Sequence, residues 1–544
     1  AAHAARRGQR GMSRRAEWLM ALALAMVVGF GFQGSRGLFE TTEGRYAESA
    51  REMLASGDYL EPTLAGRPHW TKPPPVYWSI AAGLRLAGHN AWGARLANAA
   101  AFVATVMLVA GLGASLWDVR TGLVAALVYA TSLFPVVAAN VVSADTLLTL
   151  VETGAMLAYV RAYRAPDPAG ARWWVRAMWA AFGLAFFVKG PPGLLPLAAV
   201  IAFQRMHRRP SPRLLDGWGF LLFLGIGGWW YVASALRHPG LLGYFVGDEV
   251  VGRVLTAEHH RNPEWYKPAL IYLPVLLFGS GAWLVYAMPT LRRAQLLDRG
   301  AWRRRRERGG AAALLALWLL VPLLVFSLAR SRLPLYVLPL YVPIALGLAR
   351  AVAVRWPAPG GRLPRPVVRL ALLSAMGLVL LKGVAAQLPS PSDMGALAGD
   401  IRARAGRDAG VWLVAEDKMF GLDFYLDGRV RRVSRDGRER WADERLDALL
   451  RDVAEGRTPP RNLIATGAWS DSLRQVLSHT SVAWTVIPLR GRDLFVVDPP
   501  VTSVQAPRMR ESAARHVAIT AANARTSGVR GRPVSRSAGG TSRH

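Results

Sequence analysis

Blocks of apolar residues recur along the chain, and each approaches the roughly 20 residues that a helix needs to cross about 30 Å of hydrocarbon. With 52% hydrophobic residues and 20 tryptophans in 544 residues, the chain is too apolar for a soluble protein of this size. The sequence therefore predicts a mainly α-helical, polytopic transmembrane bundle of about 11 to 13 spans. Eleven runs with few or no charges lie near residues 18–33, 96–117, 122–140, 145–163, 173–188, 191–204, 217–236, 268–289, 311–328, 333–350 and 367–386.

The formal net charge of +31 raises the question of a nucleic-acid partner. The arginines, however, cluster in alternate loops, at the N-terminus and in 205–213, 292–308 and 350–369. Placing these loops in the cytoplasm satisfies the positive-inside rule, and an odd number of spans then sends the C-terminal region outside. The basic residues thus indicate topology, and we expect no nucleic-acid partner.

The first apolar run follows several arginines, a pattern that also describes a secretory signal. No small-residue cleavage site follows Phe32, so we expect an uncleaved first span. Beyond the last run, short β-like stretches ("GVWLVA", "LDFYL", "NLIAT", "AWTVIPL", "DLFVV") alternate with helix-compatible ones, which predicts a small α/β domain. The expected divisions are a basic N-terminus 1–17, a transmembrane domain 18–388 with its first outer loop 34–95, an outer α/β domain 389–500, and a disordered basic tail 501–544.

With this topology, the carboxylates, histidines and proline-braced cations gather on the outer face, in loops such as "HWTKPPPVYW" and "EHHRNPEWYK". A site there would face away from the ATP and nucleotide sugars of the cytoplasm, so any donor substrate would have to be activated before it reaches the outer face. The chain has no cysteine, which excludes disulfides and thiolate metal sites.

The first outer loop contains "TTEGRYAESAREM" directly after the first span. In a helix from about residue 43, Glu43 and Tyr46 share a face, and Arg45 lies on a neighbouring one. For Glu48, Arg51 and Glu52, the pattern favours solvated charges on an amphipathic helix at the lipid headgroups. For Glu43 and Arg45, a functional and a structural role remain open.

Proline-braced cations recur at the ends of spans. Three prolines follow Lys72 and hold the backbone extended, which suits a point-charge ligand for phosphate. Lys189 in "FVKGPPG" and Arg332 in "SRLPLYVLP" repeat the pattern, and with Arg45 and Arg261 they could form a cationic cage for phosphate. The alternative for Lys72 is a snorkelling anchor at the membrane surface.

Acidic residues mark the start of one span in "SADTLLTLVETG". Ser143, two residues before Asp145, is the expected helix cap, and helix capping alone could explain an acid at this place. Glu152 lies inside the apolar run, where an ionisable group suggests function. The alternative for Glu152 is a structural ion pair with an arginine of another span.

These motifs, in order and spacing over residues 18–350, resemble the bacterial polyprenyl-phosphate glycosyltransferases of the aminoarabinose transferase and protein mannosyltransferase superfamily. The resemblance implies a GT-C type enzyme of the bacterial inner membrane with its active site on the periplasmic side. It would move a sugar, with inversion, from a polyprenyl (undecaprenyl) phosphate to a lipid A-like or other lipid or protein acceptor of the cell envelope.

The resemblance also implies residue roles. Glu43 and Asp145 would be the catalytic acidic pair of the sugar cavity. The residues that would bind the lipid phosphate or line the same cavity are Arg45, Tyr46, Lys72, Lys189, Arg261, Arg332 and Tyr336.

Two departures from the family pattern bear on the chemistry. Thr42 stands where the family often has its first acid, and Thr71 stands where a glutamate usually precedes the lysine. That glutamate and a histidine are metal ligands in the aminoarabinose transferases. These departures leave no cofactor certain, and a divalent metal (Zn or Mg) would have to use His260 or His69 in place of the missing glutamate.

Two other functions compete with the transferase. A transporter or flippase could use the same cationic cavity to move an anionic polyprenyl-linked lipid, but the sequence has no internal repeat. A structural membrane anchor would leave the outer motifs without a role. If the acceptor is a hydroxyl, Asp145 or Glu43 must act as a base, whereas an acceptor that is already anionic needs none.

Overall fold

The computed structural model describes residues 13–207, 211–247, 262–293, 310–356, 361–416, 418–437, 439 and 441–500. The chain divides into two compact units, which are described separately. The first comprises residues up to 409 together with 418–430, and the second comprises 410–417 and the residues from 431 onward. The expected basic tail, and most of the expected basic N-terminus, lie outside the described residues.

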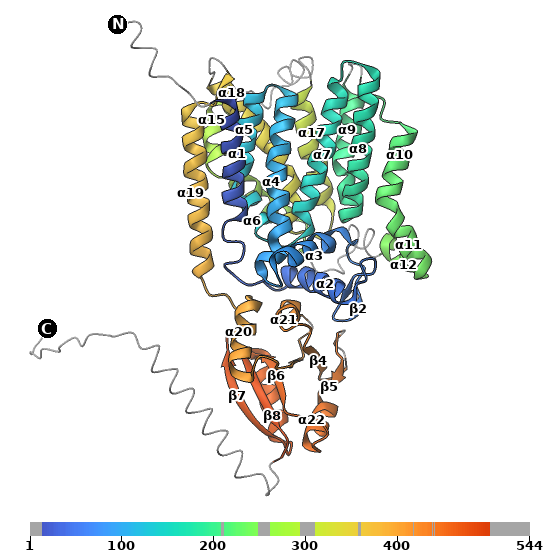
Figure 1. Ribbon diagram of the computed structural model, residues 1–544, viewed down its shortest axis with the longest axis vertical. Helices are drawn as coiled ribbons and strands as arrows, with labels where there is room; N and C mark the ends of the chain where they lie inside the picture. Colours follow the sequence, from blue (N-terminus) through green and yellow to red (C-terminus); the bar gives the residue numbers. More distant parts are fainter. Residues whose placement is uncertain are drawn as a thin grey trace, which may run out of the picture. The chain divides into compact units, whose positions relative to one another are not determined.

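The first unit is a bundle of helices (Figure 1). All eleven apolar runs of the sequence are helical in it. Capping side chains mark several starts: Asn90, Ser143 and Asp167 each accept a hydrogen bond from a backbone N–H of the first turn. The helices that contain the runs are α1 (Arg14–Phe30), α4 (Ala91–Leu116), α5 (Val119–Ala130), α6 (Leu133–Ala139), α7 (Ala144–Arg164), α8 (Pro168–Lys189), α9 (Leu195–Met206), α10 (Gly217–Phe223), α11 (Trp229–Arg237), α14 (Lys267–Phe278), α15 (Ala282–Arg293), α17 (Ala311–Leu328), α18 (Tyr341–Arg355) and α19 (Arg365–Gln387).

Within the described residues, five helices are long and apolar enough to cross a membrane, and up to seven if each of two bent pairs is one span. The bent pairs are α5 with α6, at 62°, and α14 with α15, at 89°. The prediction of a mainly helical fold with several apolar, span-length helices is confirmed. The count of eleven or more spans stays a prediction.

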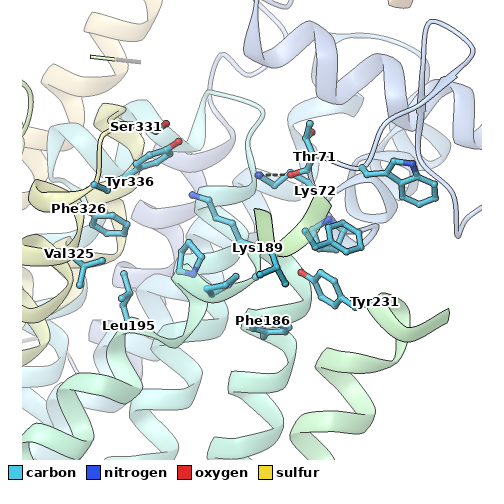
Figure 2. A pocket seen from close by; sticks show the side chains of 18 of the residues that line it. Thr71, Lys72, Phe186, Lys189, Leu195, Tyr231, Val325, Phe326, Ser331 and Tyr336 are labelled. Atoms are coloured by element: carbon cyan, nitrogen blue, oxygen red, sulfur yellow. Dashed lines mark hydrogen bonds between the residues drawn. The ribbon is translucent and has the colours of Figure 1, made fainter. Parts of the chain in front are cut away.

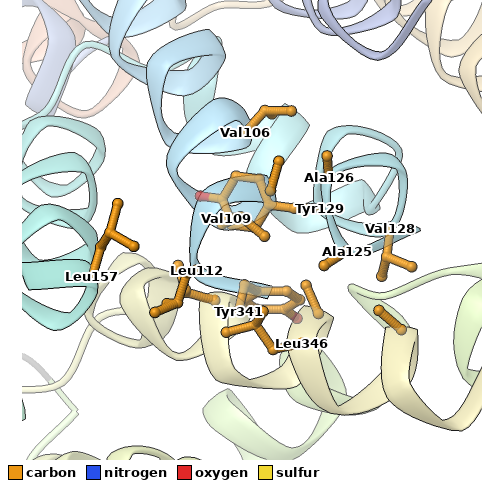
Figure 3. Close-up of a cluster of buried hydrophobic side chains, with 14 of the residues drawn as sticks. Val106, Val109, Leu112, Ala125, Ala126, Val128, Tyr129, Leu157, Tyr341 and Leu346 are labelled. Atoms are coloured by element: carbon orange, nitrogen blue, oxygen red, sulfur yellow. The ribbon is translucent and has the colours of Figure 1, made fainter. Parts of the chain in front are cut away.

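The core of the bundle lies between α4, α5, α7 and α18 (Figure 3). Val106 and Val109 of α4, Tyr129 of α5 and Leu346 of α18 pack there and are fully buried. A Cβ atom at Gly113 of α4 would lie 2.7 Å from the Cα atom of Gly122 of α5. Small residues therefore allow these two backbones to approach closely, as is common between membrane helices.

The segment between α1 and α4, which the sequence predicts to be the first outer loop, folds into α2 (Thr42–Ser56), a short hairpin of β1 (Thr63–Leu64) and β2 (Arg67–Pro68), and α3 (Pro75–Ala87). The helix expected from about residue 43 is thus confirmed, but the expectation of solvated charges is wrong for Glu48. Its side chain is buried because α2 packs against α3 on one side and against α21 (Phe420–Tyr425) on another. Arg51 donates two hydrogen bonds of 2.7 Å to the Glu48 carboxylate.

Residues beyond 388 also belong to the first unit. There, α20 (Met394–Ala405) packs against α21, and α21 packs against α2. A Cβ atom at Gly44 would lie 2.3 Å from the backbone nitrogen of Gly421, so this close approach requires glycine. The expected domain boundary at residue 389 therefore differs from the division between the two units.

The second unit contains a six-stranded mixed sheet in the order β5-β4-β3-β6-β8-β7. β3 pairs with β6 in parallel, whereas β8 pairs with β6 and β7 in antiparallel fashion. Four of the five β-like stretches of the sequence are strands, and "LDFYL" is wrong because it falls on α21, whose residues are buried from Phe420 to Phe424. The elements are β3 (Val411–Val414), β4 (Val430–Ser434), β5 (Glu444–Arg445), α22 (Leu446–Ala454), β6 (Arg461–Thr466), α23 (Gly467–Ser478), β7 (Ala483–Leu489) and β8 (Arg492–Asp498).

Candidate active site

A cavity of about 430 Å³ opens in the first unit, where the loop before α3 meets the ends of α8 and α17 (Figure 2). Its lining consists of polar or charged side chains and of apolar ones. The polar and charged side chains are Thr71, Lys72, Lys189, Tyr231, Ser331 and Tyr336. The larger apolar side chains are Trp70, Phe186, Leu195, Leu242, Phe245, Val246, Val325 and Phe326, of which three lie on the short helix α12 (Leu241–Val246).

Lys189 is the last residue of α8, and Gly190 ends the helix with a φ of +74°, a conformation that favours glycine. The ammonium group forms an ion pair with the carboxylate of Asp145, and both side chains are 9% exposed. Lys189 also lies 4.8 Å from the centre of the Tyr336 ring. Three residues singled out in the sequence thus come together from distant segments, and two of them, Lys189 and Tyr336, line the cavity.

Asp145 lies in the first turn of α7. Its backbone N–H donates to the hydroxyl of Ser143 at 3.3 Å, so the predicted cap is present. The Asp145 side chain pairs with Lys189, so the capping role does not use its carboxylate. Glu152 lies farther along the same helix, is buried, and interacts electrostatically with Lys189 and Asp145. Among the described residues no arginine pairs with Glu152, and the charged neighbours there are Lys189 and Asp145.

Lys72 lines the cavity, and its ammonium group donates to the backbone carbonyl of Thr71 at 2.5 Å (Figure 2). The Thr71 hydroxyl lies 2.7 Å from Nε2 of the buried His69. Thr71 stands where the family pattern has a metal-binding glutamate. It contacts His69, the histidine that could have taken the place of that glutamate as a metal ligand. The residues that the structure describes contain no group of three or more His, Asp or Glu side chains placed to hold a metal ion. The metal candidate His260 lies outside them.

Arg45 and Tyr46 of α2 lie beside one another, with the guanidinium 5.6 Å from the centre of the Tyr46 ring. Tyr46 is buried against Tyr77 of α3 and is close enough to Lys189 to interact electrostatically. Neither Arg45 nor Tyr46 contributes to the cavity lining. Arg261, the other predicted phosphate ligand, lies outside the described residues.

The carboxylate of Glu43, a predicted catalytic residue, is surrounded by hydrogen-bond donors. Its two carboxylate oxygens accept hydrogen bonds from the side chains of Arg36 and Arg95 and from the backbone N–H groups of Phe39 and Val142. Burial raises the pKa of Glu43, but the two arginines outweigh this effect and lower the pKa to about 2. The carboxylate is therefore ionised and fully engaged, which leaves it poorly placed to accept a proton from a substrate.

Arg332 does not line the cavity, contrary to the role that the resemblance implied. Its guanidinium is 4% exposed and donates to the backbone carbonyls of Asn262, Glu264 and Ser327. Arginine presents several donors in a fixed plane, so one side chain can hold several carbonyls at once. Arg332 thus fixes the segment that begins at residue 262.

Two residues of the site, Ser331 and Arg95, were not predicted from the sequence. Ser331 lines the cavity, and its buried hydroxyl has no hydrogen-bond partner among the described residues. Arg95, which binds Glu43, is fully buried at the start of α4. An arginine at the edge of an apolar run is a signal that could have identified Arg95, whereas nothing in the sequence marks Ser331.

Comparison with known proteins agrees with the motifs. The profile of the family described as dolichyl-phosphate-mannose-protein mannosyltransferase matches residues 71–233. A relative from Sodalis glossinidius, named undecaprenyl phosphate-alpha-4-amino-4-deoxy-L-arabinose arabinosyl transferase 2, is 34% identical over 58% of this chain and 56% of its own length. A transferase of the same name from Pseudomonas aeruginosa is 33% identical over 63% of this chain. The chain thus spans 56% and 61% of the length of these two relatives.

The fold is shared with a solved structure. The crystal structure of ArnT from Cupriavidus metallidurans bound to undecaprenyl phosphate superposes with a TM-score of 0.72, over 90% of this chain and 99% of that one, at 20% identity. The apo state of that protein gives a TM-score of 0.71. The family profile, the relatives and the shared fold together confirm the predicted resemblance of this chain to the aminoarabinose transferase and protein mannosyltransferase superfamily.

Proposed function

We propose that this protein is an integral membrane glycosyltransferase that takes a sugar from a polyprenyl (undecaprenyl) phosphate. The acceptor would be a lipid A-like or other cell-envelope molecule on the periplasmic face of the bacterial inner membrane. The observation that carries the proposal is a cavity lined by Lys72, Lys189 and Tyr336, in which Lys189 is also paired with Asp145. Relatives that are 34% and 33% identical to this chain over the aligned residues are named for a donor of this class.

The two chemistries of the lining suit an amphipathic donor. Lys72, Lys189 and Tyr336 offer two cations and a hydroxyl to a phosphate, and charge-assisted hydrogen bonds of this kind are among the stronger ones. Phe326 and Phe245 belong to an apolar wall that an isoprenoid chain could contact. A nucleotide sugar would leave this wall without a partner, so the lining favours a lipid-linked donor.

The chemical step follows from the position of these charges. As an acceptor oxygen forms its bond to the anomeric carbon, the bond from that carbon to the phosphate oxygen breaks, and the phosphate gains negative charge. Lys72 and Lys189 stabilise that charge, which lowers the barrier because both are already in place. A phosphate that recruits Lys189 also releases Asp145 from its ion pair.

Asp145, once released, orients the sugar or takes the proton of a hydroxyl acceptor. An acceptor that is itself an anion transfers no proton, and Asp145 then acts only on the sugar. Glu43 takes no part in this step, because its oxygens are engaged by Arg36 and Arg95. Arg45, Tyr46 and Arg261 remain proposed substrate contacts, of which Tyr46 is close enough to Lys189 to interact electrostatically.

The test is a transfer assay with the purified full-length chain in lipid nanodiscs. Undecaprenyl phosphates that carry different sugars, 4-amino-4-deoxy-L-arabinose among them, are incubated with lipid A and with envelope protein acceptors, and products are identified by mass spectrometry. We expect one donor to release undecaprenyl phosphate and one acceptor to gain the sugar mass. Donor binding without transfer to any acceptor, combined with movement of the lipid between leaflets, would replace the transferase by a flippase.

A further inference from the structure

Residues 139–142, from the last residue of α6 to the residue before the Ser143 cap of α7, are held by side chains from elsewhere in the bundle. Each of these residues has one backbone group bonded to a different side chain. The contacts are Gln33 Nε2 to the Ala139 carbonyl at 3.1 Å, Arg36 Nη2 to the Asn140 carbonyl at 2.9 Å, Asn98 Nδ2 to the Val141 carbonyl at 2.6 Å, and the Val142 N–H to Glu43 Oε1 at 3.1 Å. A connection between two helices is rarely fixed at every residue in this way, since most loops lie at the surface in water.

Arg95 organises these side chains. It donates to both oxygens of Glu43, at 2.8 and 2.9 Å, and to the backbone carbonyls of Gln33, Arg36 and Gly37. Arg95 and Asn98 lie three residues apart on α4 and therefore share one face of that helix. Except for Arg36, all the side chains of this cluster are buried. We call Gln33, Arg36, Glu43, Arg95 and Asn98 the linker cradle.

The linker leads directly into the candidate active site. Val142 precedes Ser143, which caps α7, and Asp145 then projects its carboxylate to Lys189. Each residue of an α-helix advances the chain by about 1.5 Å, so a slip of the linker by one residue would displace Asp145 by about that distance. A misplacement of about 1 Å can cost about two orders of magnitude in rate.

We propose that the linker cradle positions Asp145 for transfer, with Arg95 and Asn98 as positioning residues that touch no substrate. The inference rests on the proposed function in so far as Asp145 is the reacting acid. The competing explanation is purely structural, because buried polar groups must be hydrogen-bonded wherever they occur. The two explanations differ in what they predict for the rate of transfer, so a matched pair of variants on α4 can separate them.

The test uses Asn98→Ala and Gln33→Ala in the full-length chain, each of which removes one contact to the linker. The matched control is Thr105→Val, because Thr105 is also buried on α4 and donates only to the Ala101 carbonyl of its own helix. Three quantities are measured for each protein: kcat at saturating donor, the Kd of the donor lipid, and Tm.

We expect kcat to fall about tenfold or more in both cradle variants, while donor Kd stays unchanged because Lys72 and Lys189 are intact. Thr105→Val should lose a similar amount of Tm and keep its kcat. Full kcat in both cradle variants, or an equal loss of kcat in Thr105→Val, would overturn the positioning role.

Hydrogen exchange of the peptide that covers residues 140–148, without substrate, gives a second readout that does not depend on activity. Exchange should be faster in Asn98→Ala and Gln33→Ala than in the wild type, and unchanged in Thr105→Val. If the wild type transfers no sugar from any donor, the proposed function fails, whereas the exchange result still decides whether the cradle holds the linker. Unaltered exchange in both cradle variants would refute the cradle itself.

Discussion

Lys189 at the end of α8 forms an ion pair with Asp145 at the start of α7, and the ring of Tyr336 lies 4.8 Å from the same ammonium group. Both charges are largely removed from water, and their pairing offsets the cost of burying them. A phosphate bound in the cavity would compete with Asp145 for Lys189. Asp145 and Lys189 thus form an ion pair that an anionic substrate can break by binding Lys189.

Asp145→Asn should fold and bind donor lipid but lose transfer. Asparagine keeps the size of the side chain, and the helix cap uses the Ser143 hydroxyl, which the substitution leaves in place. The amide cannot accept a proton, so kcat should fall by about two orders of magnitude or more if the acceptor is a hydroxyl. Single-turnover transfer and donor binding are measured together. Near-normal turnover would leave Asp145 with no chemical role.

Lys72→Ala and Lys189→Ala should weaken donor binding, each by about 1.5 to 3 kcal/mol, because each removes a charge-assisted contact to the phosphate. Binding of undecaprenyl phosphate is measured by titration in nanodiscs. The control is Lys267→Ala, since Lys267 contacts the Tyr266 ring and is absent from the cavity lining. Wild-type donor affinity in both cavity variants would instead favour the interpretation of Lys72 as a snorkelling anchor at the membrane surface.

The two buried carboxylates of α2 should give opposite pH dependences of stability. The pKa of Glu43 is lowered to about 2 because Arg95 and Arg36 outweigh burial. Its contribution is complete above about pH 4.5, the unfolded value, and is lost as pH falls toward 2. Burial raises the pKa of Glu48 to about 8, with Asp423 adding to the shift. Its contribution is therefore complete below about 4.5 and is lost as pH rises toward 8.

Thermal unfolding of the wild type, Glu43→Gln and Glu48→Gln from about pH 2 to about pH 9 covers both titration windows. The Tm advantage of wild type over Glu43→Gln should shrink on acidification, and that over Glu48→Gln should shrink as pH rises. Parallel curves for the wild type and Glu48→Gln would mean that Arg51 keeps Glu48 ionised throughout this range.

Arg332→Ala should loosen the segment from residue 262 without a direct effect on the phosphate contacts. The guanidinium holds the carbonyls of Asn262 and Glu264, so its loss should speed hydrogen exchange in residues 262–267. Because Lys72 and Lys189 hold the phosphate in the proposed site, Arg332→Ala should lower donor affinity less than Lys72→Ala does. A loss of affinity as large as that of Lys72→Ala, with unchanged exchange, would restore Arg332 as a substrate ligand.

Tags at Arg305 and after Pro500 should report opposite sides of the membrane. The expectation rests on the alternation of arginine-rich loops and an odd number of spans. Labelling of both tags from one side would change the span count by an odd number and remove the argument for an outer active site.

The sequence determined the helices and much of the cavity, because these depend on local signals. Apolar runs of sufficient length predict helices wherever they stand, and a lysine followed by glycine and proline ends a helix in any context. Lys72, Lys189 and Tyr336, which the resemblance assigned to the site, line the cavity, and their roles in binding stay predictions. The resemblance, which rests on the order of these motifs, was confirmed by the comparisons.

Only the tertiary structure decided what each charged side chain contacts. Glu43 and Asp145 are similar acids near helix starts, yet one is enclosed by Arg36 and Arg95 and the other faces Lys189. Arg332 and Lys189 are both cations at proline motifs, yet one binds backbone carbonyls and the other reaches the cavity. Ion pairs and hydrogen bonds of long side chains are made between segments distant in sequence, so their partners depend on packing that no local pattern encodes.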